Sequence, residues 1–155
     1  MAHKLRSSFA VLCLFSACAF LVAVTLISCA KEKRETRADG AGLEWLTSMD
    51  AAMEAARHEN RPVMIDFYTD WCAWCKRLDA DTYANKQVIA AAGDFVAVKI
   101  NADVERALAA KYKVTGFPTI LFTDAAGNEI HRVVGYRPPQ GFLAEMNGAL
   151  QASKR

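Results

Sequence analysis

The chain has 155 residues, enough for one ordinary domain and an appendage, and 53% of them are hydrophobic. Its 19 Lys and Arg residues against 17 Asp and Glu residues give a formal net charge of +2 at pH 7. Residues 1–29 hold two of the basic residues and no acid, so the rest of the chain is formally neutral. This balance gives no sign of a phosphate-binding surface, and we expect no nucleic-acid partner.

The N-terminus has the pattern of a targeting segment. A short basic region, residues 1–6, is followed by 22 uncharged residues from position 9 to position 30. This run ends in Leu26-Ile27-Ser28-Cys29, which resembles the lipobox of bacterial lipoprotein signal peptides. The resemblance implies that residues 1–28 are a lipoprotein signal peptide, removed before Cys29, and that Cys29 is lipidated.

A flexible tether is expected to follow the lipid anchor. Residues 29–42 are charged and then Gly-rich, without an apolar period. The lipobox would place the chain in the bacterial cell envelope, lipid-anchored and facing the periplasm; Ala30 after the lipidated cysteine favours the outer membrane. The alternative is an uncleaved N-terminal anchor, because 22 uncharged residues can cross a bilayer. The basic residues within 31–37 would then favour a cytoplasmic C-terminal side.

The remaining residues, 43–155, have the pattern of one α/β domain. Helical periodicity and short apolar runs separate the elements. The predicted elements are helices over 43–59, 72 to about 91, 104–112 and 139–151, and strands over 63–68, 95–100, 119–123 and 129–134. Strands linked by helices and then a hairpin imply a mixed β-sheet with helices on both faces.

The sequence Trp71-Cys72-Ala73-Trp74-Cys75-Lys76 stands where a predicted strand runs into a predicted helix. A dithiol exchanges disulfides only if one thiol ionises near neutral pH, since the thiolate is the nucleophile. Cys72 falls in the first helical turn, where unpaired N–H groups and the helix dipole favour a negative sulfur. Cys75 lies one turn later and can close a disulfide. We predict Cys72 as the attacking thiol and Cys75 as the resolving thiol.

A cysteine pair can also form a structural disulfide or bind a metal ion. Cys72 and Cys75 are the only cysteines after Cys29, which excludes a framework of structural disulfides. A zinc site needs two more ligands, and His58 and His131 stand far from the pair in sequence. Copper(I) handling stays open because thiolates bind this soft ion, and so does a binding module with an incidental dithiol. We expect no cofactor and no bound metal.

Four features in order resemble the thioredoxin superfamily: Asp66, the WCAWCK sequence, Lys99 and the segment Gly116-Phe117-Pro118-Thr119. The resemblance covers about residues 45–150 and is greatest to the C-terminal thioredoxin-like domain of the membrane-spanning bacterial disulfide reductase. It implies a thioredoxin-like fold and a protein-disulfide oxidoreductase that reduces protein disulfides and receives electrons from a membrane redox partner. A disulfide-forming oxidant is the alternative, because the cysteines enclose Ala-Trp in place of the usual Gly-Pro.

The resemblance also implies roles for individual residues. Asp66 would lie buried beneath the cysteines with a raised pKa and accept the proton of Cys75, with Lys99 nearby. The Phe117–Pro118 peptide bond would be cis and packed against the disulfide, so that the Phe117 backbone pairs with an extended substrate segment. The residues expected to bind substrate are Trp71, Trp74, Phe117 and Pro118.

Overall fold

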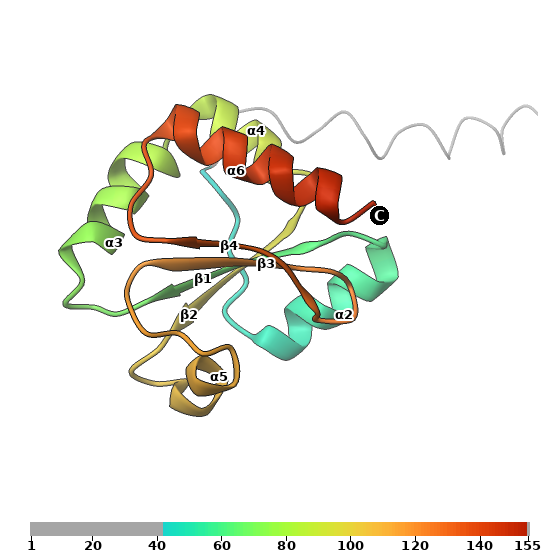
Figure 1. Cartoon of the computed structure of the whole chain (residues 1–155), viewed down its shortest axis with the longest axis horizontal. Helices are drawn as coiled ribbons and strands as arrows, with labels where there is room; N and C mark the ends of the chain where they lie inside the picture. The colour runs from blue at the N-terminus through green and yellow to red at the C-terminus, as the bar shows by residue number, and fades with distance from the viewer. Residues whose placement is uncertain (1–41, 155) are drawn as a thin grey trace, which may run out of the picture. The chain divides into compact units, whose positions relative to one another are not determined.

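The computed structural model of the protein describes residues 42–154. The predicted signal peptide, the lipidation site Cys29 and the tether up to residue 41 lie outside this range. The described elements are α2 (Met49–Glu59), β1 (Val63–Tyr68), α3 (Ala73–Arg77), the π-helical turn η1 (Leu78–Thr82), α4 (Lys86–Ala92), β2 (Val96–Asn101), α5 (Arg106–Lys111), β3 (Thr119–Thr123), β4 (Glu129–Val134) and α6 (Pro139–Ala152) (Figure 1). None of these helices is long and apolar enough to span a membrane.

The four strands form one mixed sheet in the order β2-β1-β3-β4. β1 and β2 run parallel and are joined by a crossover through α3, η1 and α4. The β1–β3 and β3–β4 pairs are antiparallel. β1 is therefore a central strand, and its register places Asp66 directly opposite Lys99 of β2.

Helices cover both faces of this sheet, as the sequence predicts (Figure 1). Successive strand residues point to opposite faces, so Met64 packs with η1, α4 and α6, whereas Ile65 packs with α2 and α5. Phe142 of α6 is fully buried on the first face, and Ala56 of α2 on the second. Asp66 follows the alternation and faces the same side as Met64, under η1.

The prediction of a helix over residues 43–59 was wrong in its first part. α2 begins at Met49, because Ser48 has an extended backbone and its side-chain oxygen accepts a hydrogen bond from the Ala51 N–H at 3.4 Å. The preceding residues are extended instead, and Leu46 forms a single parallel β-bridge with Val98 of β2. The helical spacing of Leu43 with the later apolar residues is therefore coincidental.

The single helix predicted from residue 72 to about 91 is broken into α3, η1 and α4. The π-helical turn ends with the Tyr83 N–H bonded to the Leu78 carbonyl at 2.9 Å. Asn85 then starts α4, since its side-chain oxygen accepts hydrogen bonds from the N–H groups of Gln87 and Val88. The other predicted elements are confirmed: β1, β3 and β4 have the predicted bounds, and those of β2, α5 and α6 differ by one or two residues.

Candidate active site

The two cysteines of the WCAWCK sequence form a disulfide at the start of α3, so the structure is that of the oxidised pair. Their Cα atoms lie 5.3 Å apart, and both residues are buried. The sequence predicts Cys72 in the first turn of the helix, whereas in the structure Cys72 is the N-cap of α3, one position earlier. Its sulfur still accepts a hydrogen bond from the Cys75 N–H at 3.1 Å. A backbone N–H directed at the Cys72 sulfur favours a thiolate there once the pair is reduced.

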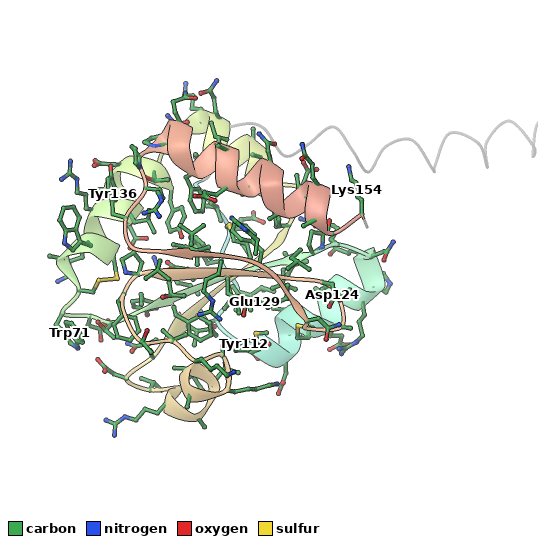
Figure 2. All side chains as sticks on the ribbon, viewed as in Figure 1. Trp71, Tyr112, Asp124, Glu129, Tyr136 and Lys154 are labelled. Atoms are coloured by element: carbon green, nitrogen blue, oxygen red, sulfur yellow. A yellow bond between two sulfur atoms is a disulfide. The ribbon has the colours of Figure 1, made fainter. Side chains whose placement is uncertain are left out.

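Two exposed tryptophans flank the disulfide. Trp71 is 69% exposed, and its indole N–H donates to Asp103 while its ring meets Phe117 edge-on at 5.9 Å. Trp74 is 54% exposed and lies 5.7 Å from the ring of Tyr136. Figure 2 shows the labelled Trp71 and Tyr136 on either side of the yellow disulfide bond. The buried sulfurs are thus framed by two aromatic pairs that present a large apolar surface to solvent.

The Phe117–Pro118 peptide bond is cis, as the resemblance implies. The Pro118 carbonyl accepts a hydrogen bond from the Gly135 N–H at 2.8 Å, which fixes this loop to the end of β4. Between residues 42 and 154, the Phe117 backbone makes no backbone–backbone hydrogen bond. Its N–H and C=O groups are available for an extended segment of another chain.

Asp66 is a charged residue in the middle of the sheet, and only 1% of its surface is exposed. Burial raises the pKa of its carboxyl from 3.8 to about 7; the nearby Lys99 ammonium opposes this rise and the Asp79 carboxylate adds to it. The Lys99 ammonium nitrogen lies 3.4 Å from one carboxylate oxygen. Neither oxygen has a hydrogen-bond partner within the described part of the chain. A buried acid with this pKa and no hydrogen bond is typical of a functional group.

Lys99 links the buried acid to the surface. Its ammonium forms a second ion pair and hydrogen bond with Asp79 of η1, whose side chain is 46% exposed. Three aromatic rings surround the same ammonium, those of Trp45, Tyr68 and Tyr83, with centroids 5.4, 5.2 and 5.5 Å away. The prediction that Lys99 lies near Asp66 is confirmed.

Four members of this cluster, Trp45, Tyr68, Asp79 and Tyr83, were missed in the sequence. Asp79 follows Cys75 by four residues, so helical spacing alone could have placed it on the same side of the helix. Tyr83 is buried beside Asp66, and burial, followed by the Asp66 charge, raises its pKa well above the ordinary value. Trp45 gave no signal, because the sequence predicts it in a helix and the structure places it in an extended segment.

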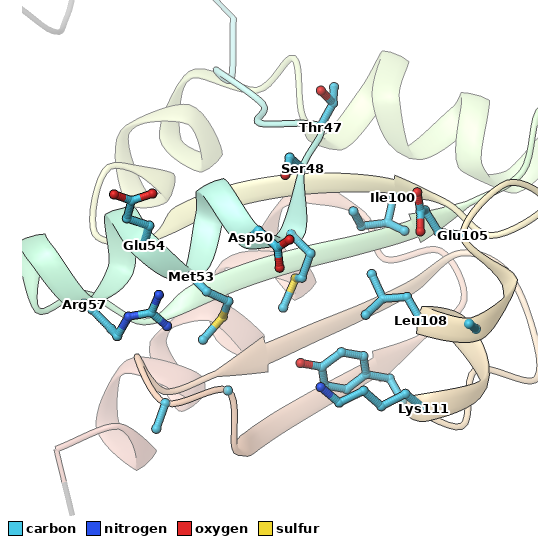
Figure 3. A pocket seen from close by; sticks show the side chains of 15 residues that line it. Thr47, Ser48, Asp50, Met53, Glu54, Arg57, Ile100, Glu105, Leu108 and Lys111 are labelled. Atoms are coloured by element: carbon cyan, nitrogen blue, oxygen red, sulfur yellow. The ribbon is translucent and has the colours of Figure 1, made fainter.

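An open groove of about 870 Å³ lies on the other side of the sheet (Figure 3). Its floor includes Met53 of α2, Ile100 of β2 and Leu108 of α5. None of its lining residues is a predicted site residue, so the groove is separate from the disulfide. Among residues 42–154, no group of three or more His, Cys, Asp or Glu side chains is placed to hold a metal ion.

Comparisons with known proteins agree with this geometry. A family model described as a thioredoxin-like domain matches residues 49–150. The thiol:disulfide interchange protein DsbD of Ralstonia nicotianae is 37% identical over 110 residues, which cover 68% of this chain and 18% of the relative. The chain therefore spans less than a fifth of the length of that relative.

Two solved structures have similar folds. A thioredoxin from Thermus thermophilus matches with a TM-score of 0.66 and 26% identity, covering 73% of this chain and 91% of that structure. The oxidised C-terminal domain of DsbD from Neisseria meningitidis matches with a TM-score of 0.57 and 24% identity, covering 70% of this chain and 99% of that domain. The second likeness supports the fold alone.

Proposed function

Because this chain belongs to the thioredoxin-like domain family, we propose that it is a protein thiol–disulfide oxidoreductase acting through Cys72 and Cys75. One observation carries the proposal: the WCAWCK disulfide stands next to η1, and the buried Asp66 carboxyl, which has an ion pair with Lys99 but no hydrogen bond, lies under η1 on the sheet. A structural cysteine pair needs no such acid, whereas an exchange reaction has to move a proton on and off a thiol. The identity to thiol:disulfide interchange proteins supports the same reaction.

The proposed reaction reduces a substrate disulfide in two exchanges. In the reduced protein, the Cys72 thiolate attacks one substrate sulfur; the substrate S–S bond breaks and its other sulfur leaves as a thiolate. Cys75 then loses its proton to Asp66 and attacks the Cys72 sulfur, which releases the second substrate sulfur. Two electrons have passed to the substrate, and the protein is left with the Cys72–Cys75 disulfide of this structure.

Asp66 suits the role of proton acceptor. A group with a pKa of about 7 changes its protonation near neutral pH, where general acid–base catalysis is most effective. Its ionised form is also the form that the Lys99 ammonium, 3.4 Å away, stabilises. Asp79 gives Lys99 a partner that remains when Asp66 is protonated.

We propose that substrate binds across the surface around the disulfide, between the Trp71–Phe117 pair on one side and Trp74 on the other. The Phe117 backbone next to the cis-proline would pair with an extended substrate segment, as in strand addition. The two exposed indoles would contact the residues around the substrate disulfide. The substrate class is therefore a protein with an accessible disulfide in an extended segment.

We also propose that the domain works in the bacterial cell envelope, tethered to the membrane through a lipidated Cys29 and facing the periplasm. The lipobox-like end of the apolar run supports this hypothesis, as does the similarity to DsbD, a longer protein. A membrane redox partner would return electrons to the pair. Mass spectrometry of the mature chain tests the anchor: an acylated N-terminal Cys29 supports it, and an unprocessed Met1 refutes it.

The reduction potential of the Cys72–Cys75 pair tests the direction of electron flow. The full chain, solubilised in detergent, is equilibrated with defined ratios of reduced and oxidised thiol, and a Cys72→Ser/Cys75→Ser double variant serves as the blank. A potential near that of thioredoxin, about −270 mV, or lower supports a reductase. A potential near about −120 mV makes the protein an oxidant and overturns the proposed direction. If no disulfide forms in any buffer, the oxidoreductase proposal itself fails.

A further inference from the structure

The residues just before α2 form a short strap across the edge of the sheet. We call residues 43–46 the strap. The Leu46 N–H donates to the Ala97 carbonyl at 2.9 Å, and the Leu46 carbonyl accepts from the Lys99 N–H at 2.8 Å. These two bonds attach the strap to β2, the outer strand beside Asp66, at the position of Lys99 itself.

The strap places one large side chain, Trp45, on the buried charge cluster. The Trp45 ring meets the Tyr83 ring edge-on with centroids 4.9 Å apart, and the Lys99 ammonium lies 5.4 Å from the Trp45 centroid. Trp45 is half-buried and packs against the same core as Met64. The indole thus forms one wall of the space that holds Lys99 and, behind it, Asp66.

The other walls of this space are formed by ionisable side chains that face Asp66 or Lys99. β2 contributes the Lys99 ammonium, η1 contributes the Asp79 carboxylate, and the residue after η1 contributes the Tyr83 phenol. Tyr68, two residues along β1, contacts Lys99 through its ring. Trp45 is the wall that brings no ionisable group, so its effect on Asp66 is that of an apolar cover.

We propose that Trp45 is a positioning residue, which keeps water away from the Asp66 carboxyl, while Asp79 holds the Lys99 ammonium in place. The significance for catalysis rests on the proposed function, in which Asp66 accepts the Cys75 proton. Burial is the largest cause of the raised Asp66 pKa, so hydration through a missing wall lowers that pKa. Lys99 stays close in that case, because Asp79 still binds it.

The strap therefore links the protonation of Asp66 to the attachment of residues 43–46 to β2. Anything that lifts residues 43–46 from β2 uncovers Lys99 and makes Asp66 a stronger acid. Removal of the indole and detachment of the strap should have the same effect. If both changes lower the Asp66 pKa, the effect comes from uncovering Asp66; if only the loss of the indole lowers it, the effect belongs to the tryptophan side chain itself.

The test is the carboxyl-carbon NMR titration of Asp66 in the oxidised, detergent-solubilised full chain. In Trp45→Ala the midpoint is expected to fall by about one pH unit or more, while Trp45→Phe, which keeps a ring in place, stays near the wild type. Leu46→Pro removes the N–H that anchors the strap and should lower the midpoint in the same way. Leu46→Ala keeps that N–H and is the matched control, expected to leave the midpoint unchanged.

Three outcomes overturn the proposal. They are a midpoint within about 0.3 unit of the wild type in folded Trp45→Ala, an equal fall in Leu46→Ala, and an unchanged midpoint in Leu46→Pro. If Trp45→Ala does not fold, the pair Leu46→Pro and Leu46→Ala decides alone. The titration involves no turnover, so it can succeed even if the chain proves not to be an oxidoreductase. The pH profile of disulfide exchange by Trp45→Ala would then separately report whether the shift matters for the reaction.

Discussion

The buried carboxyl of Asp66 predicts a specific dependence of stability on pH. The pKa of Asp66 is raised to about 7 in the folded chain from an ordinary value of 3.8. Folding therefore takes up a proton between these two values, and the free energy of unfolding falls as the pH rises through this window. Above the folded-state pKa the full cost of burying the charge is present. Asp66→Asn removes the titration and should remove this part of the slope.

The size of the effect follows from the shift. A rise of about three units, at about 1.36 kcal/mol each, corresponds to about 4 kcal/mol between fully protonated and fully ionised Asp66. About 2 to 3 kcal/mol of this falls between pH 5 and pH 8, because part of the loss has already occurred at pH 5. The lowered pKa values of Asp124 and Glu129 act in the acid range and contribute little to this interval.

Urea denaturation of the oxidised wild type and of Asp66→Asn, each at pH 5 and pH 8, measures the difference directly. We expect the wild type to lose about 2 to 3 kcal/mol more than the variant over this interval, with the variant the more stable protein at pH 8. Both proteins keep the disulfide and the same surface charges elsewhere, so other titrating groups cancel. If the two proteins lose the same free energy of unfolding between pH 5 and pH 8, within about 0.5 kcal/mol, Asp66 titrates normally in the folded chain and our account of the site is wrong.

Two further predictions concern the ion pair and the dithiol. Lys99→Met removes the ammonium that lowers the Asp66 pKa, so the carboxyl should titrate at a higher pH than in the wild type; an NMR titration in which the midpoint stays or falls contradicts this. Cys75→Ser should accumulate a mixed disulfide between Cys72 and an oxidised protein substrate, visible as a mass increase under non-reducing conditions, whereas Cys72→Ser should not. Equal trapping by both variants would show that the roles of nucleophile and resolving thiol are wrongly assigned.

Local patterns in the sequence were sufficient for most of the sheet and for the dithiol. β1 is buried on both faces, and the sequence shows it as a short, nearly continuous apolar run of strand length; the position of Cys72 at a strand-to-helix junction follows from two adjacent elements. The first residues of the helices were harder to predict from the sequence, because they depend on capping hydrogen bonds. Ser48 and Asn85 start helices inside stretches whose apolar spacing reads as continuous helix.

The burial of Asp66 marks the limit of sequence reasoning from the residues themselves. An acid in an apolar strand reads as an edge or exposed position, and the superfamily resemblance was needed to expect it inside. The structure gives the reason: β1 is central, so both of its faces are covered by helices. Strand order is a tertiary property that no local pattern contains.

The amino-acid sequence alone identifies the atoms that can do chemistry: two thiols spaced by one helical turn, one acid in β1 and one proline before β3. The environment of these atoms depends on how the chain folds. The cluster around Lys99 joins Trp45, Asp66, Asp79 and Tyr83 from separate segments, and its charges act on one another through distance and exclusion of water. Because electrostatic effects depend on how deeply the charges are buried, the pKa that suits Asp66 to proton transfer exists only in the folded chain.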